Sequence, residues 1–174
     1  KKLLVIVAHP DDESFLAAGT LRRNAEEGGT NYLLCVSLGA LGVSYVSLEI
    51  TKTELKKIRK EELLKVCHEL QIKHSKILNL PDSEIHAKRT ELKKYILDFT
   101  EVCAPDYILS FGSDGYTGHR DHIAVGEVSK RVASKVKIPF LQFTKPCNEL
   151  CKALSVYLKI KQKKGSYKEC KEET

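Results

Sequence analysis

The sequence predicts a single-domain α/β fold in which a mostly parallel sheet is flanked by helices on both faces. Short apolar runs of strand length alternate with longer segments of helical periodicity, and this order is typical of parallel α/β sheets. The first run, residues 3–8, contains no polar side chain, as expected of a strand buried on both faces. The length of 174 residues suits one domain with a sizeable core.

The strands are defined by apolar runs that end in polar or glycine-containing sequence. A loop with glycine and serine at residues 39–47 follows the second run, and a polar loop at residues 112–118 follows the fourth. Pro81 and Asp82 follow the third run. Five strands are expected, at residues 3–8, 31–37, 76–80, 106–111 and 139–143.

The helices are defined by apolar residues at helical spacing. Gly28 and Gly29 end the first helix, and Pro105 closes the third. The second has the clearest apolar face, with Lys and Glu on the other side. That face consists of Leu55, Ile58, Leu63, Val66, Cys67 and Leu70. Five helices are expected, at residues 14–27, 51–70, 87–103, 123–136 and 149–161.

The charge distribution separates a basic end from the rest of the chain. The net charge is +6, and residues 159–174 carry six lysines and three glutamates. Such an end is more often solvated than a nucleic-acid arm, and no aromatic residues interleave with the basic ones as a stacking surface requires. We therefore predict a domain at residues 1–162, a frayed basic tail at residues 163–174, and no nucleic-acid partner.

Hydropathy and cysteine spacing predict the cellular compartment of the protein. No apolar run reaches the roughly 20 residues of a membrane span, and residues 3–7 lead into polar sequence without a signal-peptide cleavage site. The six cysteines form no Cys-x-x-Cys pair. Free cysteines pack as small hydrophobic residues in reducing compartments. The sequence therefore predicts a reduced, cytoplasmic protein with no membrane span.

Two polar clusters follow buried strands and precede helices. One is Ala-His-Pro-Asp-Asp-Glu at residues 8–13, and the other is Gly-His-Arg-Asp-His at residues 118–122. Ligands in open parallel sheets bind outside the carboxyl ends of the strands. We therefore expect the two clusters to meet at one edge of the sheet.

The residue types in these clusters suit a mononuclear metal hydrolase. His9, Asp12 and His122 can supply two imidazoles and a carboxylate, and leave a position open for water. Asp11 is then free to act as general base and to return the proton to a leaving amine. His119 can stabilise a developing oxyanion or act as acid, and Asp121 can orient a histidine.

Simpler interpretations exist for each part. Acidic residues at a helix start favour the macrodipole without any chemistry, and His-x-x-His alone is a weak pattern. Arg59 is either a solvated helical charge or a group that enters the site, and Asp82 is either a turn residue or a ligand for substrate hydroxyls. His68, His74 and His86 have no partner pattern and are expected at the surface.

The two clusters resemble the signature motifs of the PIG-L/LmbE-like zinc N-deacetylases. Arg59 and Glu62 also resemble the Arg-x-x-Glu helix of that family, and Leu80-Pro81-Asp82 resembles its segment after the third strand. The resemblance covers roughly residues 3–143. It departs from the family at Gln71, where glycine is usual, in the short loop after Gly39, and after Phe143.

The resemblance implies a Rossmann-like fold and a chemistry close to the one derived above. By similarity, zinc would be bound by His9, Asp12 and His122, with Asp11 as general base. His119 would stabilise the tetrahedral intermediate with support from Asp121. Arg59 and Asp82 match substrate-contacting positions. The implied reaction is hydrolysis of an N-acetyl group from an N-acetylglucosamine (GlcNAc) conjugate, giving acetate and a free amine.

Two other functions remain open at this point. One is another mononuclear metal hydrolase of phosphoesterase type, although phosphoesterases more often use two metals and more carboxylates. The other is a non-catalytic binding domain on the same fold, which would have no need of Asp11 beside Asp12. The sequence does not decide between Zn²⁺ and Fe²⁺, which two histidines and a carboxylate also suit. It leaves the native small-molecule substrate and a homo-oligomeric state open.

Overall fold

The computed structural model describes residues 1–42 and 50–144. The chain divides into two compact units, Lys1–Phe143 and Thr144–Thr174. All of the second unit except its first residue lies outside the described part. The helix predicted at residues 149–161, the tail at residues 163–174 and part of the loop at residues 39–47 therefore also lie outside it.

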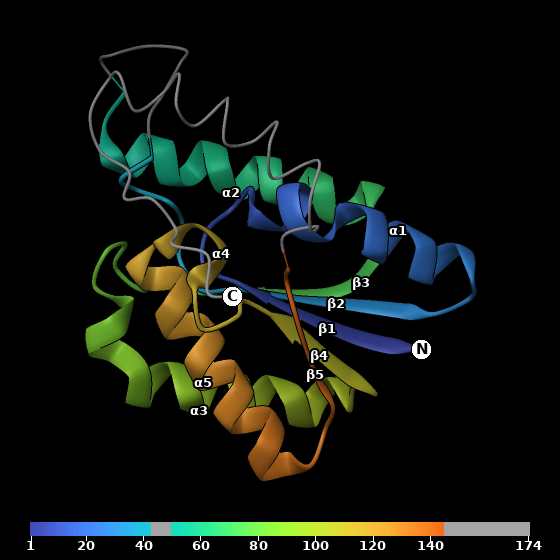
Figure 1. The fold of residues 1–174 in the computed structure, drawn as a ribbon. Coiled ribbons are helices and arrows are strands. Elements are labelled where there is room, and N and C mark those ends of the chain that lie inside the picture. Colours follow the sequence, from blue (N-terminus) through green and yellow to red (C-terminus); the bar gives the residue numbers. More distant parts are fainter. Residues whose placement is uncertain (43–49, 145–174) are drawn as a thin grey trace, which may run out of the picture. The chain divides into compact units, whose positions relative to one another are not determined.

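The first unit contains the predicted parallel sheet (Figure 1). Its five strands are ordered β3-β2-β1-β4-β5, and all four pairings are parallel. The strands are β1 (Lys2–Val7), β2 (Thr30–Cys35), β3 (Ile72–Ile77), β4 (Tyr107–Ser110) and β5 (Phe140–Gln142). The predicted α/β fold with a parallel sheet is confirmed.

Strand β1 lies at the centre of the sheet, as its uninterrupted apolar sequence predicts. Residues 4–7 are fully buried, and the strand pairs with β2 on one side and β4 on the other. Leu3 is in register with Asn31 of β2 and with Tyr107 of β4. Because the three strands are parallel, the residues that follow β1 and β4 emerge at the same edge of the sheet.

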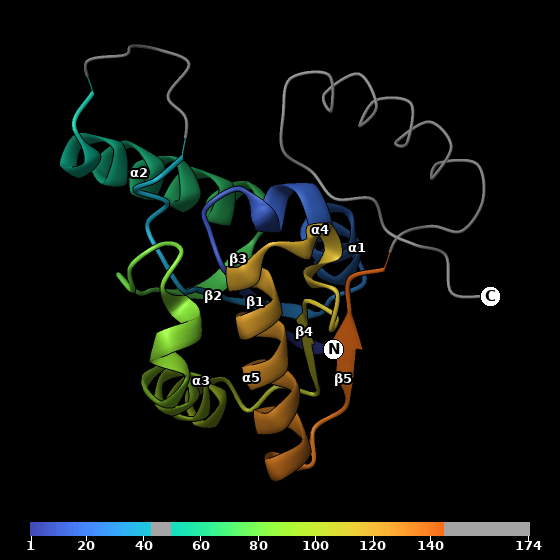
Figure 2. The ribbon, with the colours of Figure 1, turned by 60° about the vertical axis from the view of Figure 1, so that its left-hand side comes forward.

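Helices cover both faces of the sheet (Figures 1 and 2). α1 (Ala18–Glu26) and α2 (Lys52–Glu69) lie on one face. α3 (Arg89–Cys103) and α5 (Arg120–Val136) lie on the other. Thr51 caps α2 in a capping box with Glu54, which satisfies backbone donors that a helix start leaves free.

Short helical segments refine the predicted boundaries. A π-helix, η1 (Glu13–Ala17), precedes α1, and a 3₁₀-helix, η2 (Ile85–Lys88), precedes α3. A short α4 (Gly115–Gly118) occupies the predicted loop before α5. α5 begins at Arg120, three residues earlier than predicted, because His119 caps it.

Two predictions about individual elements are wrong. β3 begins at Ile72 rather than at residue 76. As an edge strand it tolerates exposed polar residues such as Lys73 and His74, so its first half lacks the apolar run that marks buried strands. On α2, Leu63 and Cys67 are buried as predicted, but Ile58 is 39% exposed.

Cys35, Cys67 and Cys103 are free and buried, in agreement with a role in core packing. Within residues 1–42 and 50–144, no helix has both the length and the apolarity to cross a membrane.

Gly126 allows α5 to pack directly against the end of β4. A Cβ atom at this position would clash with the Phe111 carbonyl oxygen. We expect Gly126→Ala to destabilise the protein by about 1–3 kcal/mol through overpacking. Gly19, in α1, has no neighbour within 4 Å of an added Cβ, so Gly19→Ala should stabilise the protein by up to about 1 kcal/mol through helix propensity. Urea unfolding measures the free energy of unfolding of both variants. Equal changes in Gly126→Ala and Gly19→Ala would contradict the close packing of α5 at Gly126.

Candidate metal centre

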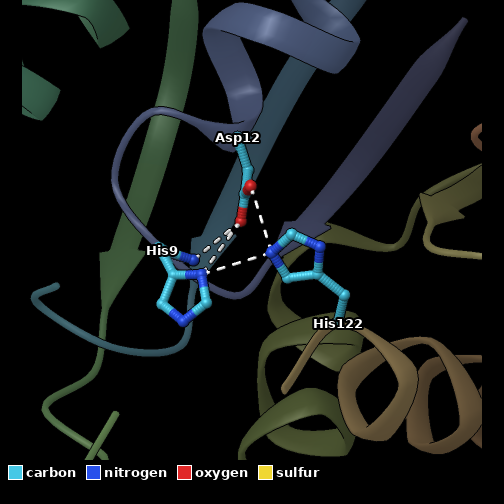
Figure 3. Close-up of side chains that lie close together, drawn as sticks. All are labelled: His9, Asp12 and His122. Carbon is cyan, nitrogen blue, oxygen red and sulfur yellow. Dashed lines mark hydrogen bonds and ion pairs between the residues drawn. The ribbon is translucent and has the colours of Figure 1, made fainter. Parts of the chain in front are cut away.

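The two polar clusters meet at the carboxyl ends of β1 and β4. His9 and Asp12 lie in the turn that follows β1, and His122 lies in the first turn of α5. In Figure 3 the three side chains converge on a common point from these two parts of the chain. Asp12 and His122 are buried, and His9 is partly buried. The parallel pairing of β1 with β4 therefore brings together residues that are 113 positions apart.

The spacing of the three side chains suits a tetrahedral metal ion. Nδ1 of His9 lies 3.3 Å from Nε2 of His122 and 3.6 Å from Oδ2 of Asp12. Oδ1 of Asp12 lies 3.3 Å from Nε2 of His122. Ligand atoms about 2.1 Å from a tetrahedral zinc ion are themselves separated by about 3.4 Å. The set of two nitrogens and one oxygen could thus hold a metal ion with little rearrangement.

His9 is held between two buried carboxylates. Its backbone N–H donates to Oδ2 of Asp12 at 2.9 Å, and its Nε2 lies 3.3 Å from Oδ2 of Asp121. Burial alone would lower the pKa of His9, but the hydrogen bonds with Asp12 and Asp121 outweigh burial and raise the pKa to about 9. Burial would likewise raise the pKa of Asp12, but the contacts with His9 and His122 hold it below its usual value. The two carboxylates therefore favour a positive charge on His9 itself.

The orientation of His122 is fixed on both sides of its ring. Nδ1 lies 3.1 Å from the carbonyl oxygen of Gly115, and so carries the proton that this hydrogen bond requires. The ring stacks on Phe111, with 4.1 Å between centroids and an angle of 15°. Burial lowers the pKa of His122. The neutral ring thus directs its unprotonated Nε2 at His9 and Asp12, which is the usual arrangement of a metal-ligating histidine.

Asp121 is a buried residue that contacts one of the candidate ligands, His9. It is fully buried, and Oδ2 accepts a hydrogen bond from the Ser83 backbone N–H at 2.6 Å as well as contacting His9. The resemblance led us to expect that Asp121 supports His119. Its carboxylate contacts His9, and its backbone N–H donates to Nδ1 of His119 at 3.2 Å, so the supporting role toward His119 stays a prediction. Because Nδ1 of His119 accepts this hydrogen bond, the proton of the neutral ring is carried by Nε2. His119 is exposed, and desolvation together with the neighbouring His9 lowers its pKa.

The Asp11 carboxylate pairs with Arg59 and makes no hydrogen bond to the three candidate ligands among the described contacts. The carboxylate is half-exposed and accepts a hydrogen bond from Nη2 of Arg59 at 2.6 Å. Burial raises the pKa of Asp11 to about 6, and the charge of Asp12 adds to this rise while Arg59 opposes it. A carboxyl group with such a pKa can both accept and donate a proton near neutral pH. Arg59 also donates to the carbonyl oxygens of Gly39, at 3.0 Å, and Pro10.

The two predicted substrate-contacting residues both approach this edge of the sheet. Arg59 enters from α2 and contacts the turn that carries Asp11. Asp82 follows β3, and its Oδ2 accepts a hydrogen bond from the Leu41 backbone N–H at 2.8 Å. Arg59 and Asp82 thus both form hydrogen bonds with the backbone of the loop that follows β2. His68 and His74 are exposed, whereas His86 is partly buried and was not expected there.

Three supporting groups were not singled out from the sequence. They are the Ser83 backbone N–H, the Gly115 carbonyl and the Glu13 carboxylate. The first two act through the main chain, so residue type gives no signal for them. Glu13 stands within the first cluster, but it is 1% exposed and its carboxylate accepts hydrogen bonds from the Asp11 N–H and the Ser14 hydroxyl.

Comparison with known proteins identifies the family. A family model described as "PIG-L: GlcNAc-PI de-N-acetylase" matches residues 4–133. The chain belongs to the PIG-L family. This confirms the resemblance found in the two clusters, both of which lie within the matched residues.

Curated relatives in the PIG-L family are deacetylases by name. The probable N-acetyl-α-D-glucosaminyl L-malate deacetylase 2 of Bacillus anthracis is 30% identical over 129 residues, which cover 73% of this chain and 57% of the relative. Its Bacillus subtilis counterpart is 31% identical, covering 78% and 62%. The N-acetylglucosaminyl-phosphatidylinositol de-N-acetylase of Bos taurus is 26% identical, covering 79% and 53%. The chain spans little more than half the length of these relatives.

Solved structures share the PIG-L fold. The N,N'-diacetylchitobiose deacetylase of Pyrococcus horikoshii superposes with a TM-score of 0.68 at 20% identity, covering 91% of this chain and 67% of that one. GalB, the 4-carboxy-2-hydroxymuconate hydratase of Pseudomonas putida, gives a TM-score of 0.67 at 24% identity, covering 77% and 56%. At these identities the likeness establishes the fold alone.

The convergence of His9, Asp12 and His122 predicts one metal ion per chain. His122→Ala should weaken metal binding by more than about 100-fold, because even outer partners of metal ligands contribute 10- to 100-fold. The control is His68→Ala, which alters an exposed histidine and should leave affinity unchanged. Calorimetric titration of metal-free protein with zinc measures both. Two ions per chain, or full affinity in His122→Ala, would contradict the assignment.

Proposed function

We propose that this chain is a zinc-dependent hydrolase that removes an N-acetyl group from a GlcNAc conjugate and releases acetate and a free amine. Three observations support this proposal: membership of the PIG-L family, curated relatives that are deacetylases of such conjugates by name, and three side chains that could hold a metal ion beside a separate carboxylate, that of Asp11. The proposed site residues all lie within the first compact unit. The domain limit at residue 162 stays a prediction.

The observation that carries the proposal is the division between two adjacent aspartates. Asp12 is turned inward to His9 and His122, whereas Asp11 is turned outward to Arg59. A binding domain would need a metal ligand but no second carboxylate beside it. A hydrolase needs both, because the group that moves protons must stand clear of the metal ligands.

The roles of the residues follow from their positions. His9, Asp12 and His122 would hold the zinc ion, which would supply the positive charge that makes water acidic near neutral pH and polarises carbonyl groups. Asp11 accepts the proton of the attacking water and delivers it to the nitrogen of the leaving amine. His119, whose Nδ1 accepts a hydrogen bond from the Asp121 N–H so that Nε2 carries the ring proton, stabilises the negative charge that develops on the acetyl oxygen. Asp121 holds His9 in its ligating orientation.

We assign the binding of the sugar to residues that lie near the candidate metal ligands. Arg59 and Asp82 are proposed to contact substrate hydroxyls, in addition to holding the loop after β2. The relatives' names specify L-malate, inositol and phosphatidylinositol conjugates of the sugar. We propose a small-molecule conjugate of this class as substrate.

Alternative chemistries receive less support. The ions of a two-metal phosphoesterase are normally bridged by a shared carboxylate. The second candidate trio among the described residues, His9, His119 and Asp121, instead shares an imidazole, that of His9, with the first. The likeness to a hydratase extends to the fold alone. Zinc, which the family resemblance implies, and a cytoplasmic location stay predictions from the sequence.

The division between the aspartates gives a direct test of function. Asp11→Asn should lower amine release by about 10²–10⁴-fold, because it removes a general acid–base group, and should still bind one zinc ion. Asp12→Asn should lose the metal. Fluorescamine detection of amine release from GlcNAc-malate, GlcNAc-inositol and GlcNAc-phosphatidylinositol, alongside zinc analysis of each variant, measures both.

Asp98→Asn, which alters an exposed carboxylate on α3, serves as the matched control and should behave as wild type. Absence of amine release from every conjugate by the zinc-loaded wild type would refute the proposed activity. Full turnover by Asp11→Asn would remove Asp11 as the base.

A further inference from the structure

The backbone of Asp11 adopts a conformation that is costly for a residue with a side chain. Its φ is +117°, which lies outside the regions that such residues normally occupy. Asp12 follows with an ordinary right-handed helical conformation, φ −57° and ψ −39°. Unusual backbone conformations of this kind persist only where the surroundings impose them. The change of backbone direction at Asp11 is what allows two successive carboxylates to point to different partners.

Helix η1 fixes one side of this residue. The carbonyl oxygen of Asp11 accepts hydrogen bonds from the backbone N–H groups of Ser14 and Phe15, both at 3.0 Å. The N–H on the other side of Asp11 donates to Oε2 of Glu13 at 3.1 Å. Asp11 is thus held by two main-chain hydrogen bonds at its carbonyl and by one side-chain hydrogen bond at its N–H.

Glu13 is an unusual residue for such a contact, because its carboxylate is buried. The residue is 1% exposed, and its other oxygen accepts a hydrogen bond from the Ser14 hydroxyl at 2.7 Å. Within residues 1–42 and 50–144, no ion pair to Glu13 is formed. Burying a carboxylate without a cation is unfavourable compared with a neutral residue of the same size. Packing alone therefore does not account for glutamate here.

The chain contains an exposed counterpart for comparison. Glu54 reaches back to the N–H of Thr51 in the capping box of α2, at 2.9 Å, and is exposed. The two glutamates make the same type of contact, but Glu13 makes it at the residue that bears the proposed base. Arg59 holds the side chain of Asp11, whereas Glu13 holds its main chain.

We infer that Glu13 is a positioning residue for catalysis: it fixes the Asp11 main chain at its positive φ, so that the Asp11 carboxylate stands apart from the metal ligands and faces the substrate side. This inference rests on the proposed function, since it concerns the placement of the base. It assigns no ligand or proton-transfer role to Glu13. Loss of the contact should misplace the base while leaving His9, Asp12 and His122 able to bind zinc.

Three substitutions of Glu13 distinguish the effect of its acceptor oxygen from the effects of its charge and its size. Glu13→Gln keeps the length and an acceptor oxygen for the Asp11 N–H, and it should retain most of kcat. Glu13→Asp keeps the charge but withdraws the acceptor by one methylene. Glu13→Leu keeps the bulk but removes the acceptor. The last two should lower kcat by about 10²-fold, the expected effect of a displacement of about 1 Å in a catalytic group, with little change in KM and with one zinc ion still bound.

The readouts are steady-state kinetics, zinc stoichiometry, thermal unfolding and exchange of the Asp11 amide hydrogen followed by NMR in zinc-free protein. The amide should exchange slowly in wild type and Glu13→Gln, and faster in the other two variants. Glu54→Leu is the control: it removes the equivalent contact in α2 and should lower stability without changing kcat. In an Asp11→Asn background, Glu13→Leu should cause no further loss.

The outcomes are distinguishable. Loss of stability without loss of kcat in Glu13→Asp and Glu13→Leu would show a purely capping role and overturn the inference, as would a loss in Glu13→Gln equal to that in Glu13→Leu. If Glu13→Leu fails to fold, the comparison of Glu13→Asp with Glu13→Gln decides the question. A wild type that releases no amine would refute the proposed function itself, and the inference with it.

Discussion

The parallel pairing of β1 with β4 is the constraint on which the rest of the site depends. The ligands come from two turns far apart in the chain, and only this pairing brings the end of β1 beside the end of β4. The apolar sequence of β1 makes it the central strand, since each of residues 4–7 is fully buried. α5 then packs closely against Phe111 through Gly126. Because His122 lies on the same helix, one turn before Gly126, this contact helps to position His122. A shift of either strand by one residue would move a ligand by about 3.3 Å.

Electrostatic balance explains why so many charged groups can be buried at this edge of the sheet. Asp12 and Asp121 lie on two sides of His9, and their hydrogen bonds raise its pKa to about 9. Positive charge at His9 thus offsets part of the cost of burying the two carboxylates. A divalent cation on the neighbouring ligand atoms would supply the same compensation with better geometry. The arrangement therefore indicates a site organised around a positive charge, with Asp11 and Arg59 forming a separate ion pair at its rim.

Much of the site could be predicted from the sequence, because its signals are local. The apolar run before His9 and the polar residues after it indicated both a central strand and a site at its end, and the second cluster gave the third ligand. Other features depend on contacts between distant segments. The carboxylate of Asp121 contacts His9 and the Ser83 N–H, which are 112 and 38 positions away in the sequence. The edge strand β3 has too few buried residues to show its first half, and no residue type signals the positive φ of Asp11.

The central claim is that two adjacent aspartates have different tasks, one holding the metal and the other moving protons. Anomalous diffraction from zinc-loaded crystals, recorded at the zinc absorption edge, tests this most directly. The account predicts a single anomalous peak about 2.0–2.2 Å from Nδ1 of His9, a carboxylate oxygen of Asp12 and Nε2 of His122, with the Asp11 carboxylate outside the coordination sphere. A peak coordinated by Asp11 in place of Asp12, or one located away from these residues, would contradict it.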